Sequence, residues 1–455
     1  MKKKISLLLV LALLIMTVAA CTTTDDESEA PPVSEENGED TETADDDVEA
    51  VESLEETITV QVESDWMEYY EDAAARVNEA HPDATVEFIE VASFDHLDVL
   101  DQTDVTNEDV ADVFAIPADR IYGLVQNDAL AAIDANSMAD NVGGFSNYDE
   151  GLGGNFQIDG EYFAFPMNIE TLITFINISN AEENDIDYAQ PIELAEVGHE
   201  DILIPIFDAW FGVSFTNAAE IELLGRDESD NLYSDLTEDF EELDTEKQEL
   251  IEALFNYWQA HKEAATPLFD EDAAWGYMDG EFETGGNTTA RIEGPWSTGA
   301  LSDLAGDGED LEIMEIGQVT VNGNPLSHWK GGWGLSINAR VEGNEGQMLL
   351  AQAMIEEIVN TEHAVEFFQA TGKILENVSI DDYLNSDLPD ADKEVIEAVL
   401  KSYEDAPARP LFTEWGQVWD TWKNAILSWN SVNPGSVEEA YQELQASFEA
   451  MMTNF

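Results

Sequence analysis

The sequence has a single cysteine, and this scarcity excludes an internal disulfide. Cys21 is the only cysteine among 455 residues, so it has no partner within the chain. It ends the run MKKKISLLLVLALLIMTVAAC, in which a basic start, an apolar stretch and small residues follow one another. That order is typical of a secretory signal, and the apolar stretch is shorter than the ~20 residues that span a membrane. We therefore predict a signal peptide over residues 1–20.

The residues just before Cys21 lead to a second prediction. The segment VAAC resembles a bacterial lipobox, which implies that Cys21 becomes the first residue of the mature chain and carries a lipid on its thiol. The alternative is an ordinary secretory signal followed by an unrelated cysteine. We expect a lipid-anchored protein on the outer face of the cell membrane.

Basic residues are also few. The chain has 16 Lys and Arg against 100 Asp and Glu, which gives a net charge of −84. Such a surface repels phosphate, which excludes nucleic acid as a partner, and it repels anionic lipid headgroups, so only the acyl chain is expected to reach the membrane. Because 44% of the residues are hydrophobic, we predict a folded protein with an acidic surface, suited to a salty or alkaline habitat where counterions screen its self-repulsion.

Most motifs of catalysis are absent. The sequence has no GxxxxGK[ST] and no GxSxG, and GLGGNF at 151–156 does not fit GxGxxG. Its six histidines are scattered without HExxH or HxxxH spacing, so we expect neither a metal site nor a cofactor. Glycoside hydrolysis by a pair of carboxylates stays an open alternative, because the sequence has so many acids that no pair can be singled out.

The chain divides into an acidic tether and a long body. Residues 21–56 contain no Lys, Arg or aromatic residue, so we predict a disordered tether stretched by its like charges. The body starts at TITVQV and runs to Phe455, about 400 residues, which is long for one core and predicts two lobes.

Strand and helix patterns alternate along the body. Strands are expected at 58–62, 84–91 and 109–116, and in EYFAFPMNIETLITFIN (161–177), which carries two strand-like runs with a proline between them. Apolar residues at helical spacing predict helices over 67–81, 244–264, 346–360 and 391–405, the second capped by Asp244 or Thr245. This alternation predicts an α/β fold with largely parallel sheets, in which ligands bind beyond the strand ends.

Tryptophan is abundant, with eleven residues, and only Trp66 precedes residue 200. Indole rings stack on the flat faces of sugars, but they also fill protein cores. Trp415, Trp419, Trp422 and Trp429 recur near one helical face, which favours the core for most of them. Polar neighbours in turns favour binding for two others, Trp296 in IEGPWSTG and Trp333 in KGGWG.

Five stretches carry a more specific signal, because they occur in a characteristic order. They are ADVFAIPADRIYGLVQNDAL (111–130), DGEYFAFPMNIETLITFIN (159–177), ARIEGPWSTGAL (290–301), HWKGGWGLSINAR (328–340) and the closing segment that starts PLFTEWGQVW at 410. Together they resemble the bacterial extracellular solute-binding proteins of the maltose and maltodextrin type. The resemblance implies an α/β, two-lobed, periplasmic-binding-protein-like fold with a ligand cleft between lobes joined by crossing strands. It implies a first lobe of residues 57–168 and 331–378 and a second of residues 172–328 and 380–455.

The resemblance also implies which residues contact the ligand. Position by position, it assigns ligand contacts to Asp65, Trp66, Asp119, Arg120, Glu170, Asp208, Trp210, Trp296, Trp419 and Lys423, and Trp333 joins them from its turn. Asp420 stands where the family has Tyr and Lys423 where it has Arg, and these two departures leave the exact sugar open. Pro117-Ala118 stands where the family often has an aromatic residue or histidine, which leaves the subsite at Asp119 and Arg120 open.

The function implied by the resemblance is binding and not catalysis. The protein is expected to be the monomeric substrate-binding component of an ABC importer, which captures maltodextrin or a related oligosaccharide, closes over it and delivers it to the permease subunits. Three alternatives stay open: a binder of a disaccharide, polyol or glycerophosphodiester; a lipid-anchored glycosidase; and a surface lipoprotein without a small ligand.

Overall fold

The computed structural model describes residues 53–455, apart from residues 146, 228, 230 and 405. Cys21, the predicted signal peptide and most of the predicted tether lie outside the described residues. The last residues of the predicted tether belong to the folded body: the Leu54 amide donates to Nδ1 of His81 at 3.3 Å, and the Thr85 amide donates to the Glu56 carbonyl at 2.9 Å. The body therefore begins a few residues earlier than expected.

The first lobe is built on a five-stranded sheet. Its strands lie in the order β2 (Thr85–Glu90), β1 (Thr57–Val62), β3 (Val113–Pro117), β16 (Gly331–Ile337) and β6 (Phe165–Glu170). All five residues of β3 are buried, as expected for an apolar strand covered on both faces. Val113 and Ala115 belong to one apolar core, and Phe114 and Ile116 belong to a second core on the other face.

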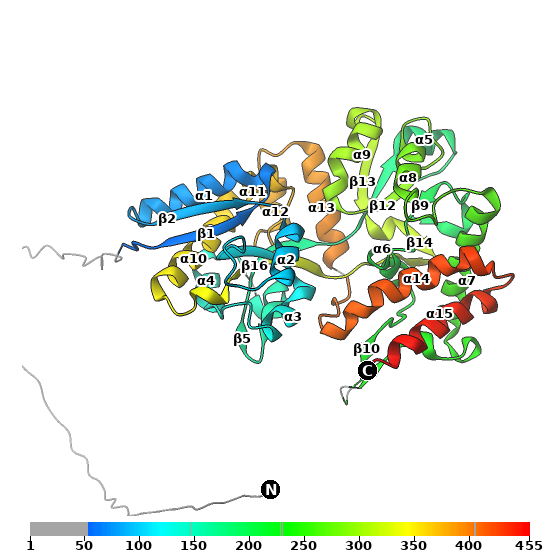
Figure 1. Cartoon of the computed structure of the whole chain (residues 1–455). Helices are drawn as coiled ribbons and strands as arrows, with labels where there is room; N and C mark the ends of the chain where they lie inside the picture. Colours follow the sequence, from blue (N-terminus) through cyan, green and yellow to red (C-terminus); the bar gives the residue numbers. More distant parts are fainter. Residues whose placement is uncertain (1–52, 146, 228, 230, 405) are drawn as a thin grey trace, which may run out of the picture. The chain divides into compact units, whose positions relative to one another are not determined.

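Helices pack around this sheet (Figure 1). They are α1 (Met67–Ala80), α2 (Ser93–Gln102), α3 (Ile121–Gln126), α4 (Ala135–Val142), α10 (Glu345–Ile358), α11 (Ala364–Thr371) and α12 (Ile380–Leu384). The first of them shows why they form: Tyr69, Tyr70, Ala73, Ala74 and Val77 are buried at helical spacing, and the other face is polar. The predicted helices over 67–81 and 346–360 are confirmed to within one or two residues.

The second lobe is built on a four-stranded sheet, a three-stranded sheet and a strand pair. The sheet has the order β13 (Leu311–Glu315), β7 (Ile173–Asn177), β12 (Ala290–Glu293) and β9 (Ile202–Leu203). Smaller sheets join β15 (Asn324–Pro325), β14 (Val319–Val321) and β8 (Ile192–Glu193); β10 (Gly225–Arg226) and β11 (Leu232–Tyr233); and, beside the first lobe's sheet, β4 (Gln157–Ile158) and β5 (Glu161–Tyr162). Its helices are α5 (Ile178–Glu183), α6 (Ala209–Ala218), α7 (Thr245–Ala264), α8 (Ala274–Phe282), α9 (Thr298–Leu304), α14 (Gly416–Val432) and α15 (Val437–Met452).

The late tryptophans show how this lobe is held together. Nε1 of Trp422 donates to the Ile206 carbonyl at 2.7 Å, and Nε1 of Trp429 donates to the Ala440 carbonyl at 3.0 Å. Both side chains are fully buried, so their assignment to the core is confirmed. Because each buried indole N–H has an acceptor, these rings fill the core without an unpaired donor.

The chain crosses between the lobes over very few residues. β6 ends at Glu170 and β7 begins at Ile173, and β16 brings the chain back beside β6. Helix α13 (Asp390–Glu404) lies between the two lobes in Figure 1 and packs on β13. Tyr383 of α12 accepts a hydrogen bond from the Leu375 amide through its hydroxyl, at 3.1 Å. Helix α12 packs into the apolar core of the first lobe through Tyr383, although its residues fall in the predicted second lobe. The other domain boundaries stay predictions.

The expectation of largely parallel sheets is wrong. β1 is parallel to β2 and β3, but β16 is antiparallel to both β3 and β6, and β7 is antiparallel to both β12 and β13. Parallel neighbours come from strand–helix–strand crossovers within one lobe. The chain passes from one lobe to the other directly before or after β6, β7 and β16. These three strands are therefore antiparallel to their neighbours. Pro166, expected between two strands, lies inside β6, opposite the register shift at Trp333 and Gly334.

Candidate binding cleft

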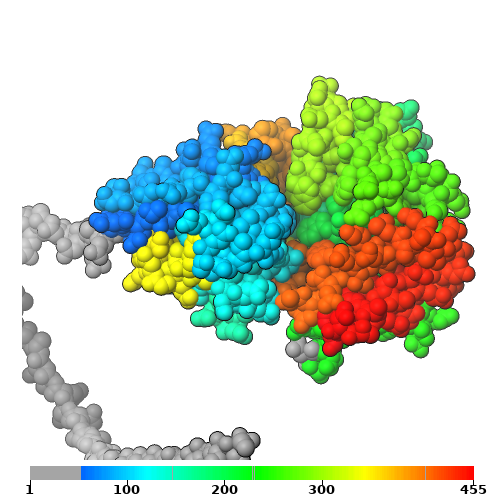
Figure 2. Space-filling view, viewed as in Figure 1, coloured from blue at the N-terminus to red at the C-terminus, as the bar shows by residue number. Residues whose placement is uncertain are grey.

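A cavity of about 1350 Å³ is lined by residues of both lobes. Figure 2 shows the surface hollowed where the blue and cyan lobe meets the green and red one. This volume exceeds the ~300–1,000 Å³ of typical small-molecule sites. The cavity is therefore large enough for a ligand of more than one ring.

The structure brings most of the predicted site residues together in this cleft. Those that line it are Trp66, Asp119, Arg120, Glu170, Asp208, Trp210, Trp296, Trp333 and Trp419. Asp65 and Lys423 are not among the lining residues. Lys423 lies 3.1 Å from Oε1 of Glu271 and 4.0 Å from Asp420, and the bond to Glu271 is the main cause that raises the pKa of its ammonium group.

The turn that presents Trp296 depends on a glycine and a proline. Pro295–Ser297 forms a short 3₁₀ turn with proline at its start, and the Pro295 carbonyl accepts a hydrogen bond from Oγ1 of Thr298 at 2.7 Å. A Cβ on Gly294 would lie 2.1 Å from the Trp296 ring, so no larger residue fits there without moving the ring. Trp296 is 48% exposed, which leaves a ring face open to a ligand.

The other rings of the second lobe form a connected group behind Trp296. The ring centroids of Trp210 and Trp296 are 6.4 Å apart, and those of Trp415 and Trp419 are 4.8 Å apart and edge to face. Trp329 lies beneath them, 4.8 Å from Trp415. Offset and edge-to-face pairs of this kind rigidify an aromatic surface.

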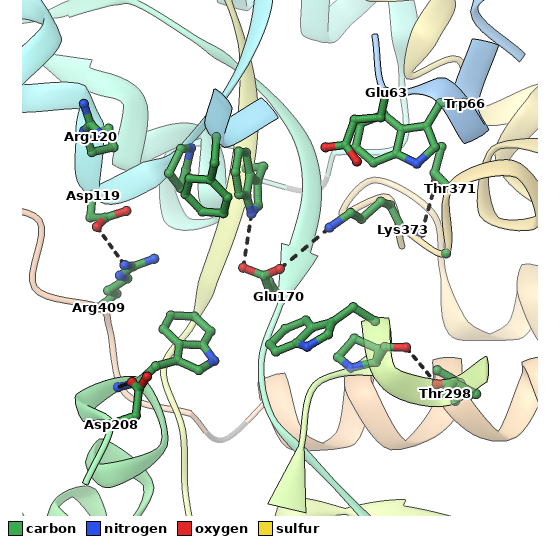
Figure 3. A pocket seen from close by; sticks show the side chains of 18 of the residues that line it. Glu63, Trp66, Asp119, Arg120, Glu170, Asp208, Thr298, Thr371, Lys373 and Arg409 are labelled. Carbon is green, nitrogen blue, oxygen red and sulfur yellow. Dashed lines mark hydrogen bonds and ion pairs between the residues drawn. The ribbon is translucent and has the colours of Figure 1, made fainter. Parts of the chain in front are cut away.

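Glu170 lies at the end of β6, where the chain leaves the first lobe. Nε1 of Trp333 donates to Oε2 of Glu170 at 3.2 Å, and Nζ of Lys373 lies 3.7 Å from Oε1 (Figure 3). The Lys373 ammonium also lies 5.8 Å from the Trp333 ring centre, and Phe94 contacts that ring edge to face at 5.0 Å. Both oxygens of Glu170 are thus oriented by neighbours.

Asp119 and Arg120 follow β3 but have different partners. Nη2 of Arg120 donates to Oδ2 of Asp101 at 2.7 Å. Oδ2 of Asp119 instead forms an ion pair with Nη2 of Arg409, 2.9 Å away, and Figure 3 shows the two side chains pointing toward each other. The guanidinium of Arg409 lies over the ring of Trp210, 5.1 Å from its centre.

Asp208 begins helix α6 and lines the cleft from the second lobe. Its carboxylate accepts a hydrogen bond from the Trp210 amide at 2.9 Å, as a helix N-cap does. Burial raises the pKa of this carboxyl group, and the Trp210 amide and Lys423 partly oppose that effect.

A buried histidine supports Trp210 from below. Nε2 of His328 lies 3.0 Å from the Trp210 carbonyl, and the ring centroids of the two residues are 4.4 Å apart. Burial lowers the pKa of His328 to about 3, so the ring is neutral at ordinary pH. Because a carbonyl only accepts, Nε2 carries the proton and donates it.

A family model described as bacterial extracellular solute-binding protein matches residues 72–395, well over half of the chain. This chain is a member of the bacterial extracellular solute-binding protein family. No curated protein matches its sequence. Within the part of the chain that the structure describes, no helix is long and apolar enough to cross a membrane, and no group of three or more potential ligands could hold a metal ion.

Solved structures show what this solute-binding protein resembles in fold. The maltose-binding periplasmic protein MalE of Listeria monocytogenes, in complex with maltose, superposes with a TM-score of 0.68 at 19% identity, over 88% of this chain and 99% of that one. MalX of Streptococcus pneumoniae, in complex with maltopentaose, has a TM-score of 0.66 at 19% identity, over 86% and 99%. The GacH receptor of Streptomyces glaucescens has a TM-score of 0.64 at 15% identity, over 89% and 100%. The two-lobed α/β fold expected from the sequence is confirmed.

Sequence reasoning missed several lining residues of this solute-binding protein. They include Glu63, Phe94, Lys373, Arg409, Phe412 and Trp415. Arg409 offered the clearest signal, because it is one of only 16 basic residues and stands in ARPLFTEW, directly before the tryptophan-rich helix. Trp415 was assigned to the core; it is 4% exposed, but it also lines the cleft.

Proposed function

We propose that this solute-binding protein captures an oligosaccharide of the maltodextrin type in its cleft and delivers it to the permease subunits of an ABC importer. One observation carries the proposal. Across a single cavity, the aromatic rings of the second lobe, with Trp296 the most exposed, face oriented polar groups of the first lobe, Glu170 and Asp119. A saccharide is bound by two kinds of group: aromatic rings that stack on the faces of the sugar, and carboxylates that accept hydrogen bonds from its hydroxyls.

The size and fold of the cleft support the same class of ligand. About 1350 Å³ is ample for several sugar rings, and two of the structures with this fold hold maltose and maltopentaose. Closure of the lobes on the sugar is expected to create the surface that the permease recognises, driven by contacts made only in the closed state.

Several further properties belong to the same proposal. The protein binds its ligand without converting it, and the structures with this fold that are named maltose-binding and maltodextrin-binding proteins support this part of the proposal. A lipid on Cys21 anchors the mature chain to the outer face of the membrane, and the acidic residues that follow separate the cleft from the lipid. The binding unit is a monomer.

Fluorescence titration of the full chain tests this proposal. Maltose, maltotriose, trehalose, sucrose, xylobiose and glycerophosphocholine are added in low and in molar salt. A saturable change with a glucan, weakened at least about tenfold in Trp296→Ala through loss of a stacking surface, is expected. Saturation only by another solute, or no change in a folded sample, overturns the maltodextrin assignment. New reducing ends after incubation with maltotriose reveal a glycosidase instead.

A further inference from the structure

Arg409 is the most enclosed cation that lines the cleft. Its side chain is 5% exposed, against 33% for Arg120 and 21% for Lys373. The guanidinium carbon lies 5.1 Å, 5.6 Å and 5.8 Å from the ring centres of Trp210, Trp329 and Trp419. A planar cation on several indole faces is strongly held, because it keeps favourable contacts after losing water.

The backbone around Arg409 is fixed at the crossing between the lobes. The Lys330 amide donates to the Pro407 carbonyl at 2.8 Å, and Lys330 and Ala408 form an isolated parallel bridge. Gly331 then starts β16, and a Cβ on this glycine would lie 4.0 Å from Nη1 of Arg409. Arg409 therefore enters the cleft from a segment that cannot shift without disturbing the crossing strand.

The partner of Arg409 comes from the other lobe. Oδ2 of Asp119 lies 2.9 Å from Nη2 of Arg409 in an ion pair, and Asp119 is the only acid that pairs with Arg409 among the described residues. The second oxygen, Oδ1, is buried and has no hydrogen-bond partner among those residues. A buried carboxylate oxygen without a donor is costly, and the Arg409 charge beside Asp119 offsets that cost, so the two side chains depend on each other.

We propose that Arg409, acting through Asp119, determines the charge selectivity of the cleft. The two side chains form a neutral polar clamp, which accepts uncharged polyhydroxylated ligands and rejects charged ones. A ligand carboxylate that competes for Arg409 is repelled by the negative charge of Asp119. A ligand ammonium that approaches Asp119 is repelled by the positive charge of Arg409. The inference rests on the proposed function and assigns to Arg409 and Asp119 the exclusion of charged oligosaccharides from the cleft.

Calorimetric titration of the full chain with three matched ligands tests the clamp. They are maltotriose, its analogue with carboxylates in place of the primary hydroxyls, and its analogue with amines there, so each ring carries the charge. Asp119→Asn leaves Arg409 unneutralised and should raise the affinity for the carboxylate analogue, relative to maltotriose, at least about tenfold. Arg409→Met should raise the relative affinity for the amine analogue by a similar factor.

Two further variants separate charge selectivity from structural damage. Arg409→Lys keeps the charge and loses the planar stacking, so it should weaken maltotriose binding while the affinity ratios stay as in the wild type. Arg76→Met removes another arginine, 21% exposed, that pairs with an acid, Glu357, and lies 5.7 Å from the ring centre of Tyr69. Because Arg76 is not among the residues that line the cleft, this variant should leave affinities and ratios unchanged.

The outcomes distinguish the inference from the proposed function. A wild-type chain that binds none of the three ligands overturns the proposed function and the inference together. A wild-type chain that binds maltotriose, with unchanged affinity ratios in Asp119→Asn, overturns the inference alone. The nearly isosteric Asp119→Asn carries this decision even where Arg409→Met fails to fold, as a melting curve reveals.

Discussion

The indole nitrogen of Trp333 donates a hydrogen bond to Oε2 of Glu170 at 3.2 Å, between two antiparallel strands that run between the lobes. Lys373 holds the other oxygen of Glu170 at 3.7 Å. Glu170 is therefore fixed in position where the chain crosses between the lobes, by Trp333 on β16 and by Lys373 in the loop after α11. A ligand that binds Glu170 therefore lies beside both β6 and β16, the two strands that connect the lobes.

The substitution Glu170→Gln keeps an acceptor for Trp333 but removes the charge opposite Lys373. We expect the affinity for maltotriose to fall roughly 10- to 100-fold, the range of a lost charge-assisted hydrogen bond. Calorimetry measures the change. Glu357→Gln, which breaks a comparable acid–arginine pair with Arg76 outside the cleft lining, is the matched control. Equal affinities in both variants contradict a ligand-binding role for Glu170.

The substitution Gly294→Ala tests whether the turn positions Trp296. The new Cβ would lie 2.1 Å from the ring, so the ring must move and ligand affinity should fall about as far as in Trp296→Ala. Gly276→Ala in helix α8 is the control, since nothing lies within 4 Å of its Cβ position. That change should stabilise the fold by ~0.5–1 kcal/mol and leave binding alone. An undiminished affinity in Gly294→Ala shows that the turn is not needed.

Stability should depend on pH through His328. Its pKa is about 3 in the folded protein, because burial opposes the charge, against 6.5 when the ring is free. Below pH 6.5 the unfolded chain binds a proton that the folded chain rejects, so stability is lost as pH falls toward 3. His328→Gln keeps a donor for the Trp210 carbonyl and should remove about 1.4 kcal/mol per pH unit from that slope. Denaturant titrations at several pH values measure it; an unchanged slope refutes the buried neutral histidine.

Glu376 changes stability with pH in the opposite direction to His328. Its Oε1 accepts from the Leu152 amide at 2.5 Å, and burial raises its pKa to about 7. The folded chain therefore keeps a proton that the unfolded chain has lost, and this contribution to stability is present below about pH 4.5 and disappears as pH rises through 7. Glu376→Gln, neutral at every pH, should be more stable than the wild type by about 1–3 kcal/mol at pH 8 and nearly equal to it at pH 4.5. Parallel unfolding curves at the two pH values decide.

Local patterns in the sequence predicted most single elements well. The helix expected over 244–264 is α7, Thr245–Ala264, because a long amphipathic pattern and an N-cap at Asp244 are signals contained in the segment itself. The burial of Trp422 and Trp429 follows from the same helical spacing. Strand direction was not predictable in this way, because it depends on how the chain crosses between lobes and not on any strand's own residues.

The sequence predicted a residue of the cleft only where that residue belongs to a recognisable motif. Trp296 could be found because Gly-Pro-Trp marks its turn, and Glu170 because it ends a recognisable strand. Arg409 has no such motif: its role arises when the fold brings it to Asp119, from a distant part of the chain. Lys423 shows the converse, since a matching position gave it a role, while here it pairs with Glu271 outside the cleft lining.

The exposure of Trp296 has a practical consequence. At 48% it is the most exposed tryptophan of the protein, while Trp258, Trp422 and Trp429 are closed off at 2% or less. A collisional quencher such as acrylamide should therefore reach Trp296 and also Trp275, which is 36% exposed and is not among the residues that line the cleft, while the three closed rings stay bright. Loss of part of this quenching on adding a ligand then reports occupancy of Trp296 in an unlabelled protein, and the quenching of Trp275, outside the cleft lining, serves as the reference.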